Sequence, residues 1–259
     1  MRFFRDLKKY RRYITYSAGA VLKSEVAGSY LSWAWWVLDP LLFMLVYTFV
    51  AQVVFRAQME HFPIFVFTGL MVWSFFEKDL VQSVSLLRAN RGIITRIYLP
   101  KQVLLLQRMA VNGFKLLISL GLILGMLAVS RVPFTWGMLW VLPHLALLLL
   151  LTFAAGSWCL HLGVFIEDLQ NVVSVLLKLL FYFSGVFYDI ATMVPAPWNR
   201  LLMAANPVAL VMEGCRGALL RGAGPDWGPL LLWTGAALLA AWLGTWMIYR
   251  YENSYGKVI

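Results

Sequence analysis

Hydrophobic residues along this chain gather into long runs, and short polar or basic segments separate the runs. About 20 apolar residues in an α-helix cross a hydrocarbon core of about 30 Å. By this criterion the sequence predicts an all-α polytopic membrane protein with six transmembrane helices, since a helix satisfies its own backbone in lipid. The predicted spans lie at about 34–55, 62–85, 103–129, 138–163, 171–190 and 228–249.

The first 28 residues have an amphipathic pattern instead. Apolar residues recur at helical spacing on one face, and basic residues crowd the other, which predicts a helix lying in the cytoplasmic membrane surface. The apolar face holds Phe3, Leu7, Tyr10, Ile14, Ala18 and Val21, and the basic face holds Arg5, Lys8, Lys9, Arg11 and Arg12. A disordered basic tail is the alternative. We therefore predict an interface helix at 1–28 and a transmembrane domain at 29–259.

The connection at 191–227, before the last predicted span, contains two apolar helical stretches that are each too short to cross a membrane. Asn206-Pro207 separates them, because a residue before proline is disfavoured in helix. The pattern predicts a helical hairpin that re-enters the membrane from the outer side. Such hairpins commonly line a path or gate, since non-helical backbone at membrane depth needs protein or water beside it. A plain external loop is the alternative.

Composition supports the membrane assignment. The chain is 61% hydrophobic and only 13% charged, whereas about 25% of residues are charged in soluble domains. Its net charge of +10 is compatible with nucleic acid, but the sequence has no nucleic-acid-binding motif. The anionic inner face of a membrane is the better partner. Two cysteines provide neither a disulfide framework nor a metal cluster.

The distribution of Lys and Arg predicts the orientation, because cytoplasmic segments are enriched in these residues. With the N-terminus inside, fourteen of them are cytoplasmic and five are external. The inner set is Arg2, Arg5, Lys8, Lys9, Arg11, Arg12, Lys23, Lys78, Arg88, Arg91, Arg96, Lys101, Arg250 and Lys257, and the outer set is Arg56, Arg131, Arg200, Arg216 and Arg221. Both termini and the segment 86–102 are therefore expected in the cytoplasm.

The side chains that catalysis would need are not clustered. An enzyme acting on lipid-linked sugars requires grouped carboxylates or histidines, yet His61, His144 and His161 lie in different segments. Glu167-Asp168 is the only adjacent acidic pair, and neighbours in a helix do not share a face. A proton-coupled carrier usually has paired halves with broken helices, and no such internal repeat is visible. Both classes stay open as alternatives, and we predict no catalytic or metal-binding residue.

Several aromatic and basic positions are candidates for a substrate path. Trp33, Trp36, Pro40, Met44 and Tyr47 form one stripe of the first span, and flat aromatic walls can hold sugar rings loosely. For the tryptophans, an interfacial aromatic belt is the alternative. In the fifth span Lys178 shares a face with Asn171 and Ser174 and needs protein, water or phosphate beside it, unless it snorkels to the interface. The predicted path lining is Trp33, Trp36, Tyr47, Lys178, Tyr182, Phe187 and Tyr188.

Four stretches in one order resemble permeases of the ABC transporter family that exports polysaccharides, O-antigen and teichoic acids. They are GSYLSWAWWVLDPLL (28–42), IYLPKQVLLL (97–106), FIEDLQNVV (165–173) and FSGVFYDIATMVPAPWNRLLMAANPVALVMEGCR (183–216). The chain departs from the family at Gly185 and Asp189, where proline is frequent. The resemblance implies a homodimer of six-span subunits in a bacterial plasma membrane. Two copies of a cytoplasmic ATPase would drive this homodimer, and the cargo would be a lipid-linked polysaccharide or polyol-phosphate polymer.

The resemblance gives the basic segment 86–102 a partner. No G-x-x-x-x-G-K-[ST] phosphate loop occurs anywhere in the sequence, so ATP and Mg²⁺ are expected on the separate ATPase and no cofactor on this chain. Pro100 marks the start of the third span, which leaves RGIITRIY as a short amphipathic segment that could fill a groove on the ATPase. The predicted coupling residues are Arg91, Ile93, Ile94, Arg96 and Ile97, with Glu167 and Asp168 in the next inner loop. A positive-inside anchor without further role is the alternative.

Overall fold

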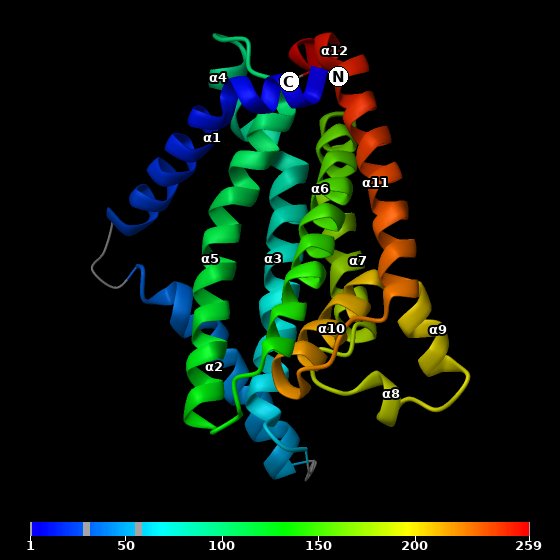
Figure 1. The fold of residues 1–259 in the computed structure, drawn as a ribbon. Helices are drawn as coiled ribbons and strands as arrows, with labels where there is room; N and C mark the ends of the chain where they lie inside the picture. The colour runs from blue at the N-terminus through cyan, green and yellow to red at the C-terminus, as the bar shows by residue number, and fades with distance from the viewer. Residues whose placement is uncertain (1, 28–31, 55–58, 259) are drawn as a thin grey trace.

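The computed structural model describes residues 2–27, 32–54 and 59–258, and every regular element in them is helical (Figure 1). The predicted boundary at residue 28, the end of the first predicted span at residue 55 and Arg56 lie outside the described residues. The helices are α1 (Arg2–Ala27), α2 (Trp35–Phe49) with a π-helical turn (Val50–Val54), α3 (Phe62–Ala89), α4 (Arg91–Ile94), α5 (Lys101–Val129), a 3₁₀ turn (Trp136–Trp140), α6 (Val141–Phe165), α7 (Leu169–Phe183), α8 (Ile190–Met193), α9 (Trp198–Ala205), α10 (Pro207–Arg221), α11 (Trp227–Arg250) and α12 (Glu252–Val258).

Within the described residues, four helical stretches are long and apolar enough to cross a membrane, by length and composition. They are Trp35–Val53, Lys101–Val129, Trp136–Phe165 and Trp227–Arg250. Helix α3 has 28 residues, but it carries charges at 77–79 in its apolar sequence. Helix α7 is apolar but has only 15 residues. It ends at Phe183, seven residues before the predicted end of the fifth span, because the chain turns at Gly185 with a φ of 66°.

Helix α3 is the centre of the bundle. It contacts α2, α5, α6, α7 and α10, and α6 in turn packs against α11 (Figure 1). Helices α3 and α6 approach closely: a Cβ on Gly163 would lie 2.1 Å from the carbonyl oxygen of Val84. Only glycine fits at such a contact.

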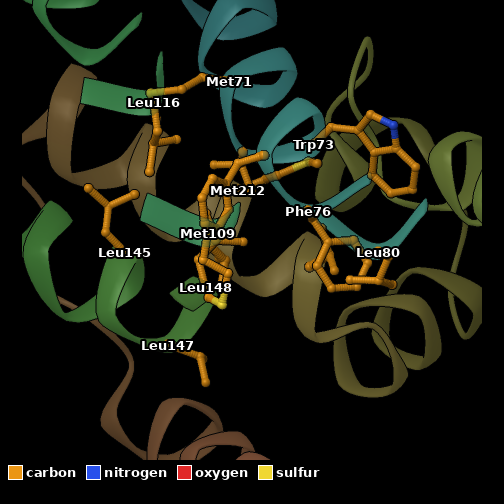
Figure 2. Close-up of a cluster of buried hydrophobic side chains, with 14 of the residues drawn as sticks. Met71, Trp73, Phe76, Leu80, Met109, Leu116, Leu145, Leu147, Leu148 and Met212 are labelled. Carbon is orange, nitrogen blue, oxygen red and sulfur yellow. The ribbon is translucent and has the colours of Figure 1, made fainter. Parts of the chain in front are cut away.

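Side chains from four helices meet in the core (Figure 2). Met71 of α3, Met109 and Leu116 of α5, Leu148 of α6 and Met212 of α10 are all buried there. Met212 has no exposed surface, so α10 is an integral part of the bundle rather than a surface loop.

The break between α9 and α10 has a local cause. Asn206 Oδ1 accepts hydrogen bonds from the backbone N–H groups of Val208 (3.0 Å) and Ala209 (3.2 Å), which caps α10. Pro207 occupies the first helical position, where its missing N–H costs no helical hydrogen bond. Asn206-Pro207 therefore ends one helix and begins the next, as the sequence predicts.

Candidate functional site

A cavity of about 720 Å³ lies between α2, α3, α5 and α7. Helix α2 contributes residues at helical spacing, which puts them on one face. The aromatic part of the wall consists of Trp35, Trp36, Phe43, Tyr47, Phe181 and Tyr182. The charged part consists of Asp39, Glu77, Lys78, Lys115 and Lys178. The cavity therefore combines flat apolar surfaces with both signs of charge.

The aromatic rings contact one another where α2 and α7 end. The rings of Tyr47 and Phe187 stack with centroids 3.7 Å apart, and Phe187 meets Phe181 edge-on at 5.0 Å. Trp73 of α3 lies 5.2 Å from Phe181. Aromatic contacts therefore join α2, α3, α7 and the turn after α7.

The charged groups of the wall have specific partners. Lys115 Nζ lies 2.7 Å from Glu25 Oε2 of α1 and 5.2 Å from the ring centroid of Trp36. Glu77 Oε2 accepts a 2.7 Å hydrogen bond from Trp73 Nε1. These contacts stabilise charges in a largely apolar bundle.

Most of the predicted path residues lie at this cavity. Trp36, Tyr47, Lys178 and Tyr182 line it. Phe187 stacks on Tyr47, and the Tyr188 hydroxyl donates a 2.6 Å hydrogen bond to the carbonyl oxygen of Tyr182. Trp33 is outside the lining, and 57% of its surface is exposed. Their role in transport stays a prediction.

The sequence reasoning missed a buried polar cluster between α3 and α5. Asp79 has no exposed surface, and its Oδ1 accepts a 2.8 Å hydrogen bond from Asn112 Nδ2. Asn112 Nδ2 also donates to Gln82 Oε1 at 3.1 Å. The sequence does indicate this cluster, because the predicted span at 62–85 contains three consecutive charged residues, Glu77-Lys78-Asp79. A criterion based on length and mean apolarity does not use such single positions. Lys78, which the sequence assigns to the cytoplasm, lies well inside α3 and lines the cavity.

The predicted coupling residues lie at the end of the molecule that holds both termini (Figure 1). The segment around α4 exposes Arg91, Ile93, Arg96 and Ile97, whereas Ile94 is half-buried and packs against the core. Exposed Glu167 and Asp168 form the turn between α6 and α7. The helix ends that lead into the two segments are in contact, because Arg88 Nη2 of α3 donates to the carbonyl oxygen of Val164 of α6 at 3.4 Å.

A polar cluster beside α4 joins the two ends of the chain. Arg2 Nη2 pairs with Glu252 Oε2 at 2.7 Å and also donates to the Tyr98 hydroxyl. The Tyr249 hydroxyl donates to Asp6 Oδ2 at 2.8 Å. Nearby, burial raises the pKa of the Tyr255 hydroxyl, so this group stays neutral 2.6 Å from His161 Nδ1.

A second cavity of about 600 Å³ lies at the opposite end, between α6, α9, α10 and α11. Its lining includes Met203 of α9 and Leu210 of α10. Arg221 Nη2 pairs with Glu213 Oε1 at 2.6 Å at its edge. The two short helices of the predicted hairpin thus face a common space.

Comparisons with known proteins give the chain a family and several relatives. The family described as "ABC-2 type transporter" matches residues 16–220. The O-antigen export system permease protein RfbA of Myxococcus xanthus is 31% identical over 263 residues and covers 100% of both chains. RfbA of Klebsiella pneumoniae is 27% identical, with 89% of each chain covered. The polysialic acid transport protein KpsM of Escherichia coli is 24% identical over 74% of this chain and 75% of its own.

Proposed function

Because the chain belongs to the ABC-2 type transporter family, we propose that it is the permease subunit of an ATP-driven exporter of a lipid-linked polysaccharide or polyol-phosphate polymer. The relatives support this polymer class, since two are named for O-antigen export and one for polysialic acid transport. The chain itself is a transport subunit and not an enzyme.

The cavity between α2, α3, α5 and α7 is the observation that carries the proposal. Trp36, Tyr47 and Tyr182 line it with aromatic rings. Lys115, which is paired with Glu25, and Lys178 line it with basic side chains. Flat aromatic faces allow sequence-tolerant sliding contacts, and lysines pair with phosphate as point charges. A polymer of sugars or polyol phosphates needs both kinds of contact.

We infer that the subunit crosses a bacterial plasma membrane six times with both termini in the cytoplasm. Besides the four long apolar helices, the crossings are α3, which helices α2, α5, α6, α7 and α10 contact, and α7 (Leu169–Phe183). Helix α1 begins in the inner membrane surface, where Arg5, Lys8 and Lys9 are exposed and Ile14 is buried. Its other end slopes toward the bundle, because Glu25 reaches Lys115 of α5. Residues 191–227 form the outer re-entrant hairpin.

We further propose that two subunits form a homodimer around one central path and bind two copies of a cytoplasmic ATPase. That ATPase holds ATP and Mg²⁺. The exposed segment around α4 and the turn at Glu167-Asp168 offer it adjacent contacts. Family membership supports such an ATP-binding partner.

Deletion of the gene in its source bacterium tests the function. Surface polymer should be lost, and its lipid-linked form should accumulate on the cytoplasmic side. The wild-type gene should restore export only together with a hydrolysis-competent ATPase. Normal surface polymer in the deletion strain would refute the proposal. Turnover of lipid-linked sugar by the purified chain alone would support the enzyme alternative.

A further inference from the structure

Arg216 of α10 is a buried cation with an unusual set of partners. Only 2% of its surface is exposed. Its Nε donates to the carbonyl oxygen of Phe65 at 3.1 Å, Nη1 donates to that of Gly185 at 2.9 Å, and Nη2 donates to that of Val186 at 2.8 Å. Three backbone carbonyls from two distant segments thus converge on one guanidinium.

The surroundings of Arg216 fit a guanidinium and no other cation. Its Cζ atom lies 3.5 Å from the ring centroid of Phe65, and Glu213 Oε2 is 4.0 Å from Nη1. A planar guanidinium stacks on a ring while its separate nitrogens bond different carbonyls, and the single ammonium nitrogen of lysine cannot reproduce this geometry. On α3, a Cβ at Gly69 would lie 2.6 Å from Arg216 Nη2, so glycine leaves the space that the guanidinium fills.

The carbonyls that Arg216 holds belong to the turn directly before Phe187. Gly185 has a φ of +66°, and a Cβ there would lie 2.6 Å from Ile190 Cγ1, so the turn depends on glycine. With Gly185 and Val186 fixed to α10, the direction in which Phe187 leaves the backbone is fixed as well.

Phe187 packs against two rings of the cavity wall, one of them near the end of α2 that points away from both termini (Figure 1). It stacks on Tyr47 at 3.7 Å and meets Phe181 at 5.0 Å, and both of these rings line the cavity. Helices α2 and α7 end in this region (Figure 1). The stacked pair therefore covers the end of the cavity that faces outward in the proposed orientation.

We propose that Tyr47 and Phe187 form an aromatic gate at the outer end of the export path, and that Arg216 is the positioning residue that holds this gate closed. The inference rests on the proposed function, because the cavity is the path only if the chain is the permease. Arg216 acts through the carbonyls of Gly185 and Val186 and does not itself touch the cargo.

The reaction of a cavity cysteine with a membrane-impermeant thiol reagent tests the gate. Ser119 lines the cavity and is buried, so Ser119→Cys is the reporter, in a chain with Cys159→Ala and Cys215→Ala. The full complex with its ATPase is labelled from outside, without added nucleotide. We expect slow labelling in this parent and at least tenfold faster labelling in Arg216→Lys and in Phe187→Ala. Arg221→Lys is the matched control on the same helix, because Arg221 is exposed and bonds Glu213 instead of the turn; it should label at the parental rate.

The double variant Arg216→Lys with Phe187→Ala decides whether the two residues act as a unit. Residues that act through one another are not additive, so it should label no faster than Phe187→Ala alone. An additive increase, or parental labelling in both single variants, overturns the inference. If Arg216→Lys does not assemble with the ATPase, Gly69→Ala replaces it, since the new methyl displaces Nη2 while the charge stays; parental labelling there also overturns the gate.

These outcomes separate the gate from the proposed function. Labelling does not require cargo, so faster labelling together with normal export in the deletion strain would show that the three residues control access to the cavity and would refute only its role in polymer export. Lost export in the deletion strain with unchanged labelling in every variant refutes only the gate. Faster labelling of the variants from the cytoplasmic side alone refutes the outward position of the gate and the orientation on which it rests.

Discussion

Lys115 illustrates how single residues carry charge in this bundle. A charge at mid-bilayer costs at least about 2.5 kcal/mol. Its ammonium is compensated by Glu25 at 2.7 Å and by the face of Trp36 at 5.2 Å. Because Glu25 belongs to α1, the same contact ties the N-terminal helix to α5. A polar residue here thus stabilises tertiary structure and also shapes the cavity.

Truncation of the aromatic wall tests its role in the path. Trp36→Ala and Tyr47→Ala should each reduce export several-fold, because each removes a flat face from the cavity, while expression and ATPase binding stay normal. Surface polymer per permease molecule is the measurement. Trp136→Ala is the matched control, since Trp136 is 88% exposed and outside the lining. Full export in the double variant would return both residues to the aromatic-belt interpretation.

Substitutions of Asp79 test whether ATP or a proton gradient drives export. In Asp79→Asn the new side-chain carbonyl can still accept the hydrogen bond from Asn112, so export should remain above about half of the wild-type rate. Asp79→Leu removes this acceptor and should lower the free energy of unfolding by about 1–3 kcal/mol. Export at constant ATP should be insensitive to a protonophore. An inactive Asp79→Asn together with protonophore-sensitive export would favour the proton-coupled carrier.

At the scale of elements, the short helical segments at the two ends of the bundle differ in how far they are buried. Around α4, Ile93 and Ile97 are 40% and 54% exposed, whereas Ile94 packs against the core. At the other end, α10 is buried between α3 and α6, although α9 exposes most of its surface. The two ends therefore offer different surfaces to partners.

The segment around α4 should bind the ATPase through its isoleucines. Ile97→Asp should prevent co-purification of the ATPase at unchanged thermal stability, because it places a charge in an apolar contact. Ile94→Asp should also lower thermal stability, since this side chain packs inward. Thr95→Asp is the control, as it adds the same charge without removing apolar surface, and it should retain the ATPase.

The arginines of the same segment should contribute less than the isoleucines. Exposed pairs are each worth about 0.2–1 kcal/mol, so Arg91→Gln with Arg96→Gln should weaken assembly mildly and in a salt-dependent way. Normal co-purification and full export in Ile97→Asp would show that the segment is only a topology anchor.

The hairpin formed by α9 and α10 makes a topological prediction. Met203 and Leu210 both line the second cavity. An impermeant thiol reagent should therefore reach Met203→Cys and Leu210→Cys from outside in a chain without Cys159 and Cys215. Thr95→Cys should be reached only from the cytoplasm. Labelling of either hairpin position from the cytoplasm alone would overturn the orientation.

At the scale of the whole molecule, the two ends of the chain meet at the end that carries the coupling segment. Arg2 bonds Glu252 and Tyr98, and Tyr249 bonds Asp6. These contacts connect α1, α11 and the residues before α5. A displacement of the coupling segment by the ATPase would therefore act on α1 and α11 together.

The assembly state is the prediction at this scale. Native mass spectrometry of the purified complex should show two copies of this 29.5 kDa chain and two copies of the ATPase. The cavity is bounded by only four helices of one subunit, which supports a path completed by a second copy. A complex with a single permease copy would contradict the homodimer.

The sequence by itself determined the helices and the family. Backbone groups in lipid must be satisfied within each segment, so apolar length and helical period are local signals. They predicted an all-helical membrane protein, and they placed the helix break at Asn206-Pro207. The quoted motifs predicted a polysaccharide-export permease of the ABC transporter class, and the match to the ABC-2 type transporter family confirms this resemblance.

Only the tertiary structure decided which neighbour each helical face meets. The helical period places Ile93, Ile94 and Ile97 on one side of a helix. Only the packing of the bundle shows that Ile94 alone among them contacts the core. Arg216 counts as an outer basic residue in the sequence, yet it bonds the carbonyl oxygen of Phe65, 151 residues away. Burial depends on contacts between segments far apart in the chain, and no local pattern encodes them. The cavity, the Asp79 cluster and the proposed gate are therefore properties of the packed bundle.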